Sequence, residues 1–312
     1  MLPVMKLFSV GDQVERGDYT VHSRFRRVVN FTNGRQLAFL VSREIGAGPL
    51  NIVVAAGFEQ ALAGVSSLRV EEDCLEVDDC RFDLKCLDRY QSNFTLAGWT
   101  PDRLGLNLEL FRQLLAGESP ADSLAFLIAP ERIQNFTSAV GRAFVSRVRR
   151  GAEQVFGGSL MAGVFLLKGC GAGLTPSGDD FIAGVLIGLH FIQQARQREL
   201  GEVIDAIFRA ATGNNVFSNT FLDLAAKGRV FGKMKNLLMA VRGEDSDVLR
   251  VAVRSLFAVG ATSGADLGTG FLMTLLDEKG AVPRWMSEVA ALRSAGKVRD
   301  ETAFAKAISS EG

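Results

Sequence analysis

Histidine is scarce in this chain of 312 residues, which contains only two, and neither sign of charge is in excess, because 35 Lys and Arg residues balance 35 Asp and Glu residues. Chymotrypsin-like and cysteine-protease mechanisms need a histidine base beside the nucleophile, and Ser177, the serine of the motif described below, has no base close to it in the sequence. These mechanisms therefore have little support. A formal net charge of zero gives no overall field that attracts nucleic acid or an anionic membrane. Neither is expected as a partner.

Cysteine occurs only four times, at positions 74, 80, 86 and 170, and no two of these residues form a C-x-x-C pair. The gaps of five residues among the first three do not match the common spacings of zinc ligands. We therefore expect buried or half-buried thiols in a reducing compartment, with Cys170 as a nucleophile left as an alternative.

Long hydrophobic runs are also missing. The longest, residues 181–192 and 160–167, fall short of the roughly 20 residues that a bilayer requires. Charged residues interrupt the N-terminal stretch too early for a signal peptide. The protein is expected to be cytoplasmic.

Residues 1–100 are predicted to form a β-rich domain, folded as a small sandwich or barrel. Between residues 19 and 94, short β-rich runs alternate with turn residues. The clearest pair, residues 28–32 and 35–41, flanks Asn33-Gly34, which favours a type I′ hairpin turn because both central residues of that turn need positive φ.

Residues 101–312 are predicted to form an all-α domain, which makes the fold class α+β. Apolar residues follow helical spacing from Asp102, the expected N-cap of the first helix, and expected helices at residues 121–128 and 131–156 come next. The arginines at positions 147, 149 and 150 are expected on a solvated helix face.

The densest motif spans residues 168–190, KGCGAGLTPSGDDFIAGVLIGLH. Its first glycines allow turns that a Cβ would forbid, and Thr175-Pro176 fixes an extended approach to the next residue. Ser177 is then predicted to be the N-cap of an apolar, buried helix. Free backbone amides and two aspartates therefore face the same space.

A second copy of this motif occurs 86 positions later, where Ser263-Gly264-Ala265-Asp266 also precedes an apolar stretch. The two copies share the pattern S-G-x-D-[FL]-x-x-G, and they would form one site if the two helix starts converge. A capping box at each helix start, with no ligand, is the alternative explanation.

Two familiar phosphate motifs do not fit the glycines of the first copy. A dinucleotide fingerprint fails because Leu174 stands where the third glycine belongs, and a P-loop fails because Asp179 and Asp180 replace its Lys and its hydroxyl residue. Aspartates repel phosphates unless Mg²⁺ intervenes, so Mg²⁺ held by these two residues stays an alternative.

The residues suit a ligand that both donates and accepts hydrogen bonds. Backbone amides at a helix start favour an oxyanion or carbonyl, whereas a carboxylate there favours an NH₂ group or a cation. A carbamoyl or amide group offers both. The candidate residues are Ser177, Asp179, Asp180 and Asp266 as catalytic groups, and Thr175, Gly178, Ser263, Gly264, Asn51, His22 and Ser218 as substrate-binding groups.

The three candidates outside the repeated motif rest on weaker patterns. His22 lies near an expected strand start, Asn51 interrupts the apolar run 50–54, and Ser218 belongs to the polar segment 212–220. For each of them, local capping or backbone hydrogen bonding is the alternative explanation.

The segment 174–184, together with Gly48-Pro49-Leu50-Asn51-Ile52 and Thr262-Ser263-Gly264-Ala265-Asp266, resembles the AllH family of oxamate carbamoyltransferase subunits. The resemblance implies a part in allantoin catabolism, in which a three-subunit assembly with FdrA-type and AllG-type partners converts oxalurate and phosphate to oxamate and carbamoyl phosphate. It implies an enzyme component that handles a small carbamoyl or carboxylate metabolite. A non-catalytic structural subunit and a stand-alone, Mg²⁺-dependent binder of a phosphorylated or carboxylate metabolite stay open as alternatives.

Overall fold

The computed structural model describes residues 5–56, 64–96 and 104–295. The chain divides into two compact units, one made of residues 1–94 and 229–236 and the other of residues 95–228 and 237–312. The domain boundary expected at residue 100 and the helix start expected at Asp102 lie outside the described residues.

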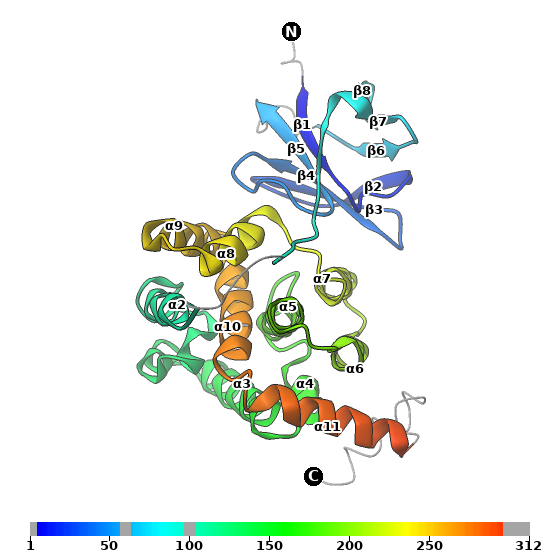
Figure 1. Cartoon of the computed structure of the whole chain (residues 1–312). Coiled ribbons are helices and arrows are strands. Elements are labelled where there is room, and N and C mark those ends of the chain that lie inside the picture. Colours follow the sequence, from blue (N-terminus) through cyan, green and yellow to red (C-terminus); the bar gives the residue numbers. More distant parts are fainter. Residues whose placement is uncertain (1–4, 57–63, 97–103, 296–312) are drawn as a thin grey trace. The chain divides into compact units, whose positions relative to one another are not determined.

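The described part of the first unit forms one curled sheet of nine strands in the order β8-β7-β6-β2-β3-β4-β5-β1-β9 (Figure 1). The α+β class is confirmed. The expected sandwich or barrel takes the form of this single sheet, because each strand pairs with the next in one continuous order. The strands are β1 (Lys6–Gly11), β2 (Gly17–Phe25), β3 (Val28–Thr32), β4 (Leu37–Ser42), β5 (Asn51–Ala56), β6 (Ser67–Val70), β7 (Cys74–Val77), β8 (Cys80–Asp83) and β9 (Asp88–Tyr90).

The predicted hairpin is present, but its turn is not of type I′. Strands β3 and β4 pair antiparallel from Val28↔Val41 to Thr32↔Leu37. Positive φ occurs at Gly34, at 87°, and not at Asn33. The asparagine acts through its side chain instead, because its Oδ1 accepts hydrogen bonds from the amides of Arg35 and Gln36 at 3.0 and 2.8 Å.

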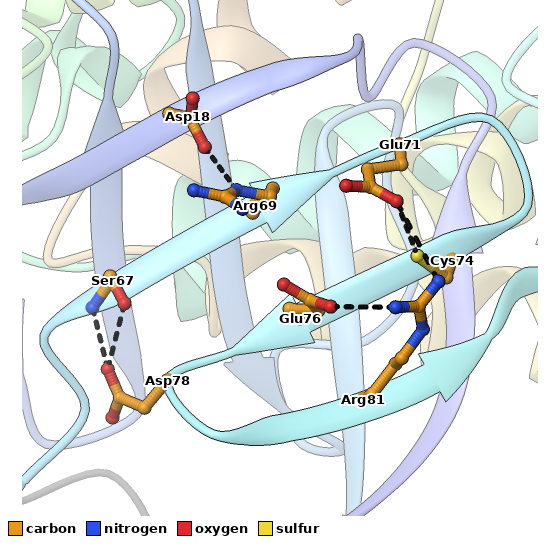
Figure 2. A network of polar contacts seen from close by, with 8 residues as sticks. All are labelled: Asp18, Ser67, Arg69, Glu71, Cys74, Glu76, Asp78 and Arg81. Atoms are coloured by element: carbon orange, nitrogen blue, oxygen red, sulfur yellow. Dashed lines mark hydrogen bonds and ion pairs between the residues drawn. The ribbon is translucent and has the colours of Figure 1, made fainter.

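A row of alternating charges crosses four strands of the sheet (Figure 2). Asp18 of β2 lies opposite Arg69 of β6, Arg69 lies opposite Glu76 of β7, and Glu76 lies opposite Arg81 of β8. The Asp18–Arg69 and Glu76–Arg81 pairs are 2.5 and 3.2 Å apart. Because three of these four residues are exposed, the row identifies the solvated face of the strands and adds little to stability.

Asp78 fixes the turn between β7 and β8, and we expect Asp78→Ala to lower the free energy of unfolding by about 1 kcal/mol. This residue has a φ of 48°, and its Oδ1 accepts bonds from the amides and hydroxyls of Ser66 and Ser67. Partial burial raises the pKa of the Asp78 carboxyl, but these hydrogen bonds outweigh that effect and lower it. The stabilisation is therefore complete above about pH 4 and disappears as pH falls through the lowered pKa.

Urea denaturation at pH 7 and pH 3 measures this effect. Asp79→Ala is the matched control, because Asp79 is the exposed neighbour and makes no hydrogen bond or ion pair among the described residues. A loss of stability from Asp78→Ala that is equal at both pH values would show that the carboxylate charge has no part in the turn.

The second unit is helical. Its α-helices are α2 (Leu104–Glu118), α3 (Ala139–Gly157), α4 (Leu160–Leu167), α5 (Ser177–Arg196), α6 (Gly201–Ala211), α7 (Val216–Ala226), α9 (Ser246–Phe257), α10 (Ser263–Leu276) and α11 (Ala281–Ser294), while α8 (Gly232–Arg242) begins in the first unit and ends in the second. No helix among the described residues is long and apolar enough to cross a membrane.

Two of the expected helices have a different form. The helix expected at 121–128 is the short 3-10 helix η2 (Leu124–Leu127), and the one expected at 131–156 is divided into the 3-10 helix η3 (Pro130–Asn135) and α3. The division follows from Ser138, whose hydroxyl accepts a hydrogen bond from the Gly141 amide at 2.9 Å and so starts α3 as an N-cap.

Helices α5 and α10 lie at the centre of the helical unit (Figure 1). Every residue of α5 from Ser177 to Leu189 is buried, and so is every residue of α10 from Gly264 to Leu272. The buried helix predicted after Ser177 is confirmed. The two copies of the repeated motif therefore start the two central helices of this unit.

Candidate functional site

The starts of α5 and α10 converge, as the repeated motif predicts. The Thr175 hydroxyl donates to Oδ2 of Asp180 at 3.2 Å and lies 3.2 Å from the Ser263 hydroxyl. The Ser263 hydroxyl faces the Asp180 carboxyl of α5, and the Ser177 hydroxyl faces the Asp266 carboxyl of α10. Each serine of the motif thus interacts with the aspartate of the other copy.

The last glycine of each copy also contacts the helix that the other copy starts. A Cβ on Gly184 would lie 2.1 Å from the carbonyl oxygen of Leu267, and a Cβ on Gly270 would lie 2.1 Å from the carbonyl oxygen of Phe181. Positions 184 and 270 are equivalent in the repeat, and so are 181 and 267. The two helices therefore pack backbone to backbone, with each copy of the motif contacting the other in the same way.

The first glycine of each copy contacts the helix that precedes it. A Cβ on Gly178 would lie 2.0 Å from the carbonyl oxygen of Leu167, the last residue of α4, and a Cβ on Gly264 would lie 1.9 Å from that of Leu256 in α9. The internal repeat therefore consists of two helix pairs, α4–α5 and α9–α10. Both glycines of the S-G-x-D-[FL]-x-x-G pattern are explained by close packing.

The capping-box alternative is wrong. Pro176 and Thr262 are the N-cap residues of α5 and α10, and neither helix has a hydrogen bond from a capping side chain. Ser177, expected as the N-cap, is the first helical residue. The reason is geometric, because the hydroxyl of each serine faces the aspartate of the other helix instead of capping its own helix.

The carboxyls of Asp180 and Asp266 are both buried, and neither forms an ion pair with a cation among the described residues. The exposed fraction is 8% for Asp180 and 0% for Asp266, and no ion pair joins either residue to a Lys or Arg in the described part of the chain. Oδ1 of Asp266 accepts a hydrogen bond from the Leu124 amide at 2.6 Å, whereas its Oδ2 has no hydrogen-bond partner among the described residues. A buried carboxyl oxygen of this kind is costly unless a further hydrogen-bond partner satisfies it.

Burial changes the protonation of both groups. Loss of solvent raises the pKa of Asp266 to about 6, although the Leu124 amide and the hydroxyls of Thr262 and Ser177 favour its charged form. Loss of solvent also raises the pKa of Asp180 well above its ordinary value, and the nearby charge of Asp266 raises it further against the hydroxyls of Ser263 and Thr175. Both carboxyls are therefore easier to protonate than an exposed aspartate, and the charge of Asp266 favours a proton on Asp180.

Asp179 has a different role from its neighbour. Its Oδ1 accepts a hydrogen bond from the Gly169 amide at 2.7 Å, which fixes the loop before α5. Three glycines of that loop have positive φ, with values of 64° at Gly169, 124° at Gly171 and 101° at Gly173, so the turns predicted from the glycines are confirmed. The described residues contain no group of three His, Cys, Asp or Glu side chains that could hold a metal ion.

Asn215 connects the glycine loop to α7. Its Nδ2 donates to the Leu174 carbonyl at 2.8 Å, and its Oδ1 caps α7 by accepting from the amides of Phe217 and Ser218 at 2.9 and 3.2 Å. The polar segment 212–220 predicts a site residue at Ser218, whereas Asn215 makes the contacts that join the loop to α7. Ser218 is 4% exposed, and its hydroxyl has no hydrogen-bond partner among the described residues.

Asn51 and His22 belong to the first unit. Nδ2 of Asn51 donates to the Gly46 carbonyl at 2.8 Å, which fixes the loop before β5, and a Cβ on Gly48 would lie 2.8 Å from this Nδ2. His22 is exposed on β2, with its Nδ1 3.1 Å from the Ser23 hydroxyl. Their part in a ligand site stays a prediction.

The cysteines are all free thiols, but not all of them are buried as expected. Cys74 and Cys170 are buried, whereas Cys80 and Cys86 are exposed, because β8 and the 3-10 helix after it form the outer end of the sheet. Burial raises the pKa of the Cys170 thiol, which opposes formation of the thiolate that a nucleophile needs.

Two family models match this chain. Residues 167–275 match the model described as oxamate carbamoyltransferase subunit AllH, and residues 5–89 match that of the AllH family N-terminal domain. The chain belongs to the AllH family. No curated protein and no solved structure matches it.

The limits of the AllH match agree with the internal repeat. The match begins at Leu167, the residue whose carbonyl contacts Gly178, and ends at Leu275, near the end of α10. It therefore contains both S-G-x-D copies and the glycine loop. The AllH N-terminal domain corresponds to the nine-stranded sheet. As a subunit by name, an AllH protein works with other chains.

Proposed function

We propose that this chain is a subunit of an oxamate carbamoyltransferase of allantoin catabolism, and that the converging starts of α5 and α10 hold the carbamoyl ligand. The family description supports the reaction class. The observation that carries the site is the buried pair Asp180–Asp266, which, within the described part of the chain, has one oxygen without a hydrogen-bond partner and no ion pair with a cation. FdrA-type and AllG-type chains are the proposed partners, and the cytoplasm is the proposed location.

The ligand makes contact through the half-buried hydroxyls. Thr175 and Ser263 are both partly accessible and both interact with the Asp180 carboxyl behind them. A carbamoyl group offers an NH₂ donor to these oxygens and a carbonyl acceptor to the proton on Asp180. Asp266 is fully buried, so it acts through Asp180, as a positioning residue.

The proposed reaction needs one proton transfer, which a carboxyl pair with a single proton can perform. The bond between the carbamoyl carbon and the oxamate nitrogen of oxalurate breaks, and a bond from that carbon to a phosphate oxygen forms. The proton of hydrogen phosphate ends on the amide nitrogen of oxamate, which balances the reaction. Asp180 would pass this proton on, because burial raises its pKa and so favours the protonated form that a general acid needs.

Thr175→Val is expected to lower carbamoyl transfer by about tenfold or more, because the hydroxyl that contacts both Asp180 and Ser263 is lost while the volume is kept. The assay is carbamoyl phosphate formation from oxalurate and phosphate by the reconstituted assembly. Thr220→Val is the matched control, because among the described residues the Thr220 hydroxyl bonds only to the Val216 carbonyl of its own helix. Full activity of Thr175→Val would remove this hydroxyl from the site.

A non-catalytic subunit is the competing function, and one observation favours it. The serines and aspartates of the S-G-x-D pattern also join α5 to α10, and its glycines pack against α4 and α9. Titration calorimetry of the purified chain with oxamate and with carbamoyl phosphate separates the two. Heat of binding that is measured for the wild-type chain and lost in Thr175→Val supports the ligand site. Absence of heat, both for the isolated chain and for the chain in its assembly, supports the structural role, and a requirement for added Mg²⁺ supports the metal-dependent binder.

A further inference from the structure

A second candidate site lies on α3, away from the paired carboxyls. A cavity of about 410 Å³ is lined by Ile133 of η3 and by one face of α3. The α3 residues are Arg142, Val145, Ser146, Arg149, Arg150 and Glu153. Their spacing of three or four positions places them on the same side of the helix.

The polar rim of this cavity carries an excess of positive charge. Three arginines face one glutamate, and the only ion pair among them, Arg149–Glu153, is long at 3.8 Å and exposed, with exposed fractions of 53% and 68%. Arg150 makes no hydrogen bond or ion pair in the described part of the chain. The Arg142 guanidinium donates to the Thr137 carbonyl, which fixes its side chain at the end of the cavity.

The floor is apolar. Val145 is 5% exposed, and Ile133 is half-buried beside it. A solvated helix face is the role predicted for Arg147, Arg149 and Arg150, and all three are exposed. Arg149 and Arg150 also line this cavity above an apolar floor, which a solvated face does not require. The cavity is open to solvent, and its volume of about 410 Å³ is large enough for a small ligand.

We propose that this cavity binds the phosphate group of a small metabolite. Guanidinium groups match phosphate oxygens in pairs, and the Ser146 hydroxyl between them adds a further donor. A neutral or cationic ligand would leave the three arginines without a counter-ion. The site uses other residues than the proposed carbamoyl site and does not depend on it.

Titration calorimetry of the full chain with inorganic pyrophosphate and with inorganic phosphate tests the proposal. We expect pyrophosphate to bind with a dissociation constant of about 1 mM or tighter and more weakly at high salt, as exposed charges require. The double variant Arg149→Gln/Arg150→Gln should weaken binding by about tenfold or more. Arg209→Gln is the control, because Arg209 is an exposed arginine of α6 without a hydrogen bond or ion pair among the described residues.

Ser146→Glu provides a second variant, which places a negative charge in the centre of the same face and should abolish binding. Asp180→Asn should leave pyrophosphate binding unchanged, which separates this site from the carbamoyl site. No heat from either probe would overturn the proposal. Retained affinity in the double variant would overturn it too, as would an equal loss in Arg209→Gln, because both results indicate unspecific attraction of anions.

Discussion

Asp180→Asn is expected to abolish carbamoyl transfer by the assembly and, at the same time, to stabilise the isolated chain at pH 8. The activity is lost because an amide keeps the shape of the carboxyl but cannot release a proton. The stability rises because the wild-type chain must hold a buried carboxyl, with a raised pKa and only 8% exposure, beside the charge of Asp266. An asparagine removes that electrostatic cost.

The pH dependence gives the sign of this effect. A carboxyl whose pKa is raised in the folded protein contributes its full stability below its unfolded pKa near 4, and loses it as pH rises through the folded pKa. For Asp266, a rise to about 6 corresponds to a change of roughly 3 kcal/mol between pH 4 and pH 8. The raised pKa of Asp180 acts in the same direction. The wild-type chain should therefore melt at a lower temperature at pH 8 than at pH 5, and Asp180→Asn should reduce this difference.

Thermal melts at the two pH values and the carbamoyl transfer assay measure the two halves of the prediction. Asp205→Asn is the control, because Asp205 is exposed on α6 and has no hydrogen bond or ion pair among the described residues. A lower melting temperature for Asp180→Asn would mean that the charged carboxylate stabilises the helix pair. Unchanged carbamoyl transfer with a raised melting temperature would make Asp180 a structural residue alone.

The sequence predicts the convergence of α5 and α10 because the repeat itself contains the information. Two copies of one motif, 86 residues apart, indicate two equivalent backbone environments, and close packing supplies such an environment for Gly184 and Gly270. Burial of Asp266 could not be predicted in this way. Its Oδ1 accepts a hydrogen bond from the amide of Leu124, which lies 142 positions earlier in the chain and belongs to neither copy.

In the fold too, features set by neighbouring residues can be predicted from the sequence, whereas features set by contacts between distant segments cannot. The β3–β4 hairpin depends on neighbouring residues, so the sequence predicts it, although the role of Asn33 in the turn differs. The assignment of residues 229–236 to the first unit depends on backbone hydrogen bonds between distant segments, from Val230 to Ser92 at 2.9 Å and from Gly232 to Ala47 at 2.8 Å. No periodicity or turn signal in the segment itself indicates these partners.

Gly270→Ala is expected to cause the largest loss of stability, about 3 kcal/mol, with a fall in melting temperature on the order of 10 °C. The added Cβ would lie 2.1 Å from the carbonyl oxygen of Phe181, which belongs to the backbone of α5 and cannot rotate away. Helix α10 would have to move as a unit. Gly117→Ala in α2 is the matched control, because a Cβ there meets no atom within 4 Å, and the substitution should stabilise the helix by up to about 1 kcal/mol.

The double variant Gly184→Ala/Gly270→Ala tests whether the two contacts belong to one helix pair. Each glycine lies against a carbonyl of the other helix, Gly184 against Leu267 and Gly270 against Phe181, so one separation of α5 from α10 relieves both clashes. The double variant should therefore lose clearly less stability than the sum of the single variants, as measured by urea denaturation. Additive losses would mean that α5 and α10 adjust separately at the two glycine contacts. The contacts between the serines and aspartates of the two motif copies would then not require a rigid α5–α10 pair.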